Sequence, residues 1–101
     1  MEEKLLFRVD KIFPLPGLGV LLIPQTAAPE LLELALYTAL KLTLRYPSGH
    51  SEAAIASVEE IEREAQGLTR ALLLTQEGAS PAPAGTEVWW TGAVARWDEL
   101  S

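Results

Sequence analysis

The chain has 101 residues, of which 49% are hydrophobic and 22% are charged, and it contains no cysteine. This composition is typical of one globular domain, and it excludes a disulfide framework and a thiolate metal site. The net charge of −6 is concentrated after residue 50, where nine acidic residues outnumber three basic ones. An acidic surface repels phosphate groups, so general nucleic-acid binding is disfavoured.

The chain starts with Met-Glu-Glu-Lys, which lacks the basic and apolar regions of a signal peptide. No apolar run approaches the roughly 20 residues that span a bilayer. We therefore expect a cytoplasmic protein without membrane contact. The absence of asparagine and the single methionine are typical of a thermophile, a signature that codon bias also leaves.

The first predicted element is a strand over residues 5–13, where apolar side chains alternate until the phase slips by one residue. That slip predicts a β-bulge near Asp10–Lys11. Two prolines then stop the strand, and Gly17 and Gly19 permit a turn with positive φ. The apolar run at residues 20–23 predicts a second, buried strand.

The leucine-rich segment that follows can be interpreted in two ways. Pro29–Leu36 is predicted as a short helix or an irregular crossing, because a proline stands where a first helical turn would lie. Alternating leucines leave two strands as the alternative. Residues 39–46 are then predicted as a strand with Lys41, Thr43 and Arg45 facing water.

The remaining elements are read from turn residues and alternation. Residues 47–50, Pro-Ser-Gly-His, predict a turn, and 78–85 predict a loop. Three more strands are predicted, over residues 52–59, 68–75 and 86–91. Together the elements predict a mainly all-β fold, a small antiparallel β-barrel of about six strands with one short helix at most, in the 29–36 connection. The barrel domain is expected over residues 1–91, with a tail at 92–101.

The stretch from Phe7 to Leu22 reads FRVDKIFPLPGLGVLL. With Ile12, Phe13, Leu15, Gly17 and Gly19 at matching positions, it resembles the opening hairpin of the second, β-barrel domain of translational GTPases such as elongation factor Tu. Later segments resemble that barrel in the same order, over roughly residues 5–90. The resemblance implies a translation-factor-like barrel, and in such factors the barrel can help to hold the aminoacyl end of tRNA.

The GTPase domain itself has no counterpart here. No Gly-x-x-x-x-Gly-Lys-[Ser/Thr] motif occurs, and Gly17-Leu18-Gly19 leads into a strand signature instead of a helix. We therefore expect no nucleotide and no cofactor, and we interpret the two glycines as parts of a hairpin.

Two groups of residues have side chains of the kinds that carry out catalysis or bind metals. His50 lies beside Ser48 and Ser51, but in a turn sequence without a nucleophile elbow. The glutamates of residues 59–64 lie on a single element, whereas a catalytic pair converges from separate elements. Neither group predicts a catalytic or metal site, so we expect a protein that is not an enzyme, with a small enzyme as the remaining alternative.

Apolar residues without an assigned place in the core indicate binding. Trp89 and Trp90 would point to opposite faces of a strand, so one of them is expected at the surface unless the tail around Trp97 covers it. The 29–36 connection has more leucines than a small barrel can bury. The candidate partner-binding residues are Trp89, Leu31, Leu32 and Leu34.

These observations lead to a preferred hypothesis and an alternative. We expect a stand-alone interaction module that binds a protein partner or forms a dimer through the leucines. The alternative is a module that binds RNA or the tRNA end, with Arg8, Lys11, Lys41 and Arg45 as the candidate RNA-facing residues. The charge of −6 opposes this alternative.

Overall fold

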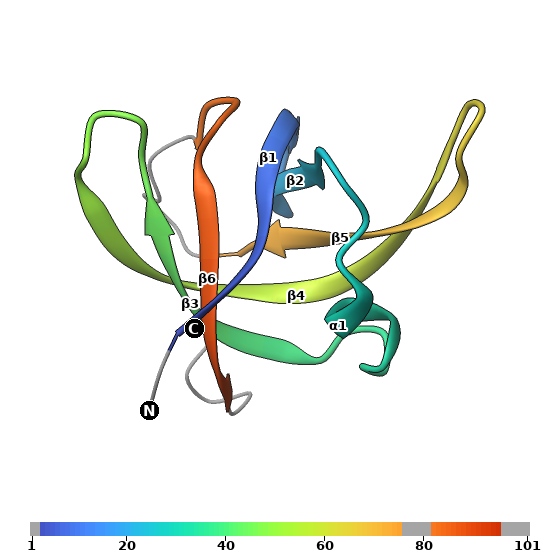
Figure 1. Cartoon of the computed structure of the whole chain (residues 1–101). Helices are drawn as coiled ribbons and strands as arrows, with labels where there is room; N and C mark the ends of the chain where they lie inside the picture. The colour runs from blue at the N-terminus through green and yellow to red at the C-terminus, as the bar shows by residue number, and fades with distance from the viewer. Residues whose placement is uncertain (1–2, 76–81, 96–101) are drawn as a thin grey trace.

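The computed structural model describes residues 3–75 and 82–95. This part of the chain forms six strands and one helix: β1 (Lys4–Leu15), β2 (Gly19–Pro24), α1 (Pro29–Leu32), β3 (Ala39–Arg45), β4 (Ser51–Arg63), β5 (Gly67–Leu74) and β6 (Glu87–Val94). The strands are antiparallel and close into a barrel in the order β1-β2-β5-β4-β3-β6 (Figure 1). The predicted all-β barrel with one short helix is confirmed. No helix in the described residues is long and apolar enough to cross a membrane.

The β1–β2 hairpin confirms the predicted bulge and turn, but the prediction that the prolines stop the first strand after residue 13 is wrong, because β1 continues through Pro14 to Leu15. The register shifts between Val9 and Lys11, which places the bulge at Asp10. Gly17 has φ +81° and Gly19 has φ +140°, values that side chains with a Cβ rarely adopt. A Cβ at Gly19 would also collide with the backbone carbonyl of Leu74 on β5. Glycine is therefore required where this hairpin lies against its neighbouring strand.

The helix is shorter than the predicted 29–36 segment. Pro29 occupies its first turn, where the missing N–H costs nothing. The helix ends at Leu32, and turns follow, up to Tyr37 with φ +71°. The Tyr37 N–H then donates to the Val58 carbonyl at 2.7 Å, which fastens the connection to β4. The segment is thus one helical turn plus an irregular crossing.

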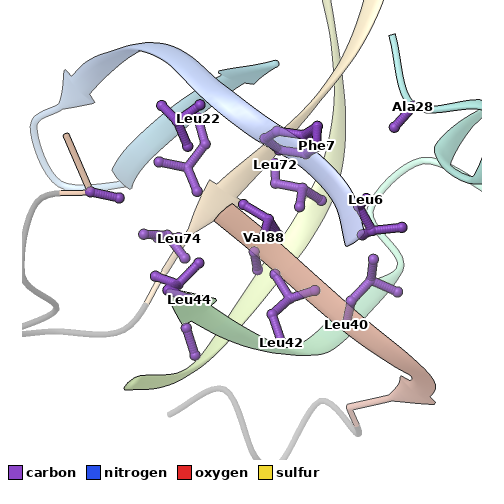
Figure 2. Close-up of a cluster of buried hydrophobic side chains, with 14 of the residues drawn as sticks. Leu6, Phe7, Leu22, Ala28, Leu40, Leu42, Leu44, Leu72, Leu74 and Val88 are labelled. Atoms are coloured by element: carbon purple, nitrogen blue, oxygen red, sulfur yellow. The ribbon is translucent and has the colours of Figure 1, made fainter. Parts of the chain in front are cut away.

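The core fills the inside of the barrel with inward-pointing side chains from every strand. Leu22, Leu40, Leu72 and Val88 are fully buried and come from four different strands (Figure 2). Each strand alternates, so these side chains point inward while their neighbours point outward. Leu31 of α1 joins the same cluster and closes one end of it.

The β4–β5 hairpin extends well beyond the barrel, toward the upper right of Figure 1. The prediction that β4 ends at residue 59 is wrong, because the strand continues to Arg63. The extension is solvated on much of both faces, so it does not need the apolar alternation on which the prediction relied. The Arg63 guanidinium fastens the hairpin, because it donates to the Pro24 carbonyl at 3.2 Å and pairs with the Asp10 carboxylate at 3.1 Å.

The end of the barrel lies beyond the expected domain boundary at residue 91. β6 continues to Val94, which pairs with Leu40 of β3. The Ala95 N–H also donates to the Ala39 carbonyl at 2.8 Å. The barrel therefore includes the first part of the predicted tail, and the rest of that tail, with Trp97, lies outside the described residues.

Candidate functional site: the outer face around Trp89

The two adjacent tryptophans of β6 point in opposite directions, as strand geometry requires. Trp90 packs against the core and donates its indole N–H to the Ala93 carbonyl at 2.9 Å. Trp89 lies on the outer face, where its register partners are Leu5 of β1 and Thr43 of β3. Its side chain is half-buried. Trp89 is therefore the surface tryptophan that the sequence led us to expect.

Three charged side chains hold Trp89 in place. Its indole N–H donates to the Glu87 carboxylate at 3.0 Å, and the Arg45 guanidinium lies 4.9 Å from the ring centroid. The other oxygen of Glu87 accepts from Arg8 at 3.1 Å. The hydrogen bond from Trp89 is the main cause that lowers the pKa of Glu87, and the Arg8 and Arg45 charges add to it. The indole is thus pre-positioned between charged groups.

These contacts define a surface that we call the Trp89 face. It spans the outer sides of β1, β6 and β3, where cross-strand partners point to the same face. The Trp89 face consists of Leu5, Arg8, Thr43, Arg45, Glu87 and Trp89.

The structure brings together only some of the candidate RNA-facing residues. Arg8 and Arg45 both lie on the Trp89 face, and Lys41 alternates outward on β3 with Arg45. Lys11 lies elsewhere, because it follows the bulge and pairs with Ile23 on β2. It lines a hollow of about 310 Å³ beside the β4–β5 hairpin.

The leucines of the connection separate into three classes. Leu31 is 0% exposed and belongs to the core, so its assignment to partner binding is wrong. Leu34 is partly buried against the core, and Leu32 is 62% exposed. The first turn of α1 lies across one end of the barrel, which explains why one leucine points inward and the next points outward. Only Leu32 among the three remains fully available to a partner.

His50 lies in a hairpin turn, and the glutamates form no metal-binding group among the described residues. The His50 ring stacks on Tyr46 with 5.8 Å between centroids, and its backbone N–H approaches Ser48 Oγ at 3.4 Å. This is the geometry of a hairpin turn between β3 and β4. In residues 3–75 and 82–95, no group of three or more His, Asp or Glu side chains is arranged to hold a metal ion.

No family model, curated protein or solved structure matches the chain. The similarity to the second domain of translational GTPases therefore stays a prediction from the residues of the opening hairpin.

The pairing of Arg8 with Glu87 was not foreseen from the sequence. The two residues are 79 positions apart and meet only because β1 and β6 close the barrel. The available signal was the alternation of Glu87 and Trp89 on one side of β6, which indicates the face but not the partner from β1.

Proposed function

We propose that the chain is a non-catalytic β-barrel interaction module that binds a protein partner through the Trp89 face. The observation that carries this proposal is the half-buried indole of Trp89, held on the outside of the barrel by Glu87 and Arg45. Tryptophan and arginine are the residue types most enriched among those that dominate binding energy at protein interfaces. A side chain that is already fixed also loses less entropy when a partner binds.

The charges of the Trp89 face favour a protein over RNA. Phosphate binding needs cations that are free to replace counterions. Arg8 is already paired with Glu87, so of the two arginines of this face Arg45, with only a 4.0 Å contact to a Glu3 oxygen, remains to bind an anion, and one cation is few for an RNA backbone. The guanidinium of Arg45 retains donors beyond that long contact. A partner segment with a carboxylate next to an apolar side chain suits this arrangement, because the carboxylate can bind Arg45 while the apolar group packs on Trp89 and Leu5.

A separate partner is favoured over a dimer through α1. The dimer hypothesis relied on several leucines without cover, yet Leu31 is inside the core and Leu34 packs against it. The exposed Leu32 offers little of the roughly 1,200–2,000 Å² that a stable interface buries. We therefore expect light scattering after size exclusion to give a mass near 11.0 kDa.

The likeness of the opening hairpin to the second domain of translational GTPases supports the same class of role, a barrel that holds another macromolecule. It carries no nucleotide chemistry to this chain, since the phosphate-binding motif is missing from the sequence.

A peptide display library selected on the full chain tests the proposal. We expect enriched peptides to combine acidic and apolar residues, and to bind Trp89→Ala at least about thirtyfold more weakly than the wild type, as for a dominant interface residue. Tyr37→Ala is the matched control, because Tyr37 is an exposed aromatic residue outside the Trp89 face.

Two results would overturn the proposal. One is the absence of any enriched peptide, and the other is equal binding to the wild type and to Trp89→Ala. A single-stranded RNA oligonucleotide is tested in parallel, and RNA binding that Arg8→Ala abolishes would support the RNA-binding alternative instead. Circular dichroism of each variant verifies that the barrel is intact.

A further inference from the structure

One edge of β5 has no strand beside it along the projecting hairpin. β2 pairs with β5 only through Leu72, Leu73 and Leu74. Residues 67–71 pair with β4 on one side, and no described residue pairs with their other side. Backbone N–H and C=O groups along such an edge are free to bond with an added strand. The barrel is closed, but its longest hairpin carries an open edge.

A groove runs along this edge, and we call it the β5 groove. Its walls are Leu68–Arg70 of β5 and the Pro24–Ala28 connection, with Leu32 of α1 at the rim. Leu68 is 68% exposed and Leu32 is 62% exposed, so both leucines present apolar surface at the groove. The groove encloses about 250 Å³, which is below the roughly 300–1,000 Å³ of a small-molecule pocket. It is large enough for side chains of a peptide.

The arginines of the β5 groove are already engaged. Arg63 pairs with Asp10 and donates to the Pro24 carbonyl. Arg70 donates to the Leu34 carbonyl at 3.3 Å, and its Nε lies 3.3 Å from Glu60, an ionic contact without hydrogen-bond alignment. Neither arginine is available to attract an acidic ligand.

Unpaired carboxylates lie beside the exposed leucine. Glu62 is the cross-strand partner of Leu68, so both side chains point to one face. Glu64 follows at the hairpin turn and is exposed. Neither Glu62 nor Glu64 forms an ion pair with a residue that the structure describes. The hairpin that carries the open edge therefore combines exposed apolar side chains with two carboxylates that form no ion pair within the described residues, although Lys11 and Arg63 line the same hollow as these carboxylates.

From this combination we propose that the β5 groove binds an extended, basic and apolar segment of a partner protein, which adds to β5 as a further strand. Main-chain hydrogen bonds to residues 67–71 supply the general attraction, and alternate side chains supply the selectivity. Apolar groups pack on Leu68 and Leu32, while lysines or arginines lie beside Glu62 and Glu64. A second copy of this chain would not bind through the same surface, since two acidic hairpins would repel each other. This site is separate from the Trp89 face.

The probe is a synthetic eight-residue peptide of alternating valine and lysine, blocked at both ends and added to the full isotope-labelled chain. We expect amide shifts in the nuclear magnetic resonance spectrum at residues 67–71 and 24–28. Hydrogen exchange of β5 amides at the open edge should slow when the peptide is bound. A peptide N-methylated at alternate residues keeps the charge but cannot form the ladder, and should bind at least about tenfold more weakly.

Variants of the chain separate strand addition from simple charge attraction. Leu68→Asn and the double variant Glu62→Gln/Glu64→Gln should each weaken peptide binding, by about fivefold or more. Leu18→Asn is the control, because Leu18 is 64% exposed but lies in the distant β1–β2 turn. The proposal is overturned if the N-methylated peptide binds as well as the parent peptide, if the shifts fall outside the groove, or if no shifts occur at millimolar peptide.

Discussion

The guanidinium carbon of Arg45 lies 4.9 Å from the centroid of the Trp89 ring, and the two residues belong to the neighbouring strands β3 and β6. A cation in this position is attracted by the ring quadrupole and covers part of the indole. The same arginine is thus both a support for Trp89 and a donor at the surface.

Replacing Arg45 with alanine should lower the free energy of unfolding by about 0.5–1 kcal/mol, the usual range for an exposed cation–π contact. The midpoint of urea denaturation gives this difference. Lys11→Ala is the control, because Lys11 is an exposed β-strand lysine with no ion pair in residues 3–75 and 82–95. Equal midpoints for the two variants would show that Arg45 adds no stability through the ring.

Measurements at acidic pH should reveal the hydrogen bond between the Trp89 indole and the Glu87 carboxylate. The folded pKa of Glu87 lies below the ordinary value of 4.5, so its carboxylate stabilises the fold above that pH, and the contribution is lost as the pH falls through the folded pKa. Trp89→Phe removes the donor, so the pKa of Glu87 should rise toward 4.5 in a carboxyl titration by nuclear magnetic resonance. Trp90→Phe is the matched control, since Trp90 donates to Ala93 instead. An unchanged pKa of Glu87 in Trp89→Phe would contradict the assignment.

The two glycines of the first hairpin should differ in their tolerance of alanine. Gly17→Ala adds a Cβ in open space but keeps a positive φ, which costs about 1–2 kcal/mol. Gly19→Ala adds the collision with the Leu74 carbonyl and should cost about 1–3 kcal/mol more. Thermal and urea denaturation followed by circular dichroism measure both. Similar losses in the two variants would mean that β2 and β5 can separate at this point without cost.

Shortening the two adjacent leucines of α1 should change the stability of the fold by very different amounts. Leu31→Ala removes a fully buried side chain and should cost about 2–5 kcal/mol of unfolding free energy. Leu32→Ala alters an exposed side chain and should stay within about 0.5 kcal/mol of the wild type. Urea denaturation of the pair provides its own internal control, and a large loss in Leu32→Ala would indicate that a second molecule covers α1 in solution.

Local patterns were sufficient for most of the barrel but not for its surfaces. The phase slip before Ile12 predicted the bulge at Asp10, because a bulge alters the alternation of the strand itself. The burial of Leu31 depends on how α1 lies across the barrel end, and no local alternation contains that information. The same holds for Arg63, whose partners Asp10 and Pro24 belong to distant strands.

Of the candidate site, Trp89 could be predicted and its surroundings could not. Alternation places Glu87 and Trp89 on one side of β6 wherever that strand lies. Arg8 and Arg45 join them only through the ladders of β6 with β1 and β3. The β5 groove gave no sequence signal, since its walls come from a strand edge and a connection that meet only in the folded chain.

The pairing of β1 with β6 has a consequence for how the chain folds. Residues as distant as Arg8 and Glu87 must meet, so the barrel cannot close until β6 has been synthesised. During synthesis, β1 and β3 therefore each keep one unpaired edge until β6 is available. Closure over so long a loop is slow, in the range of milliseconds to seconds for β folds of high contact order. The nascent chain is then most exposed to aggregation just before β6 leaves the ribosome.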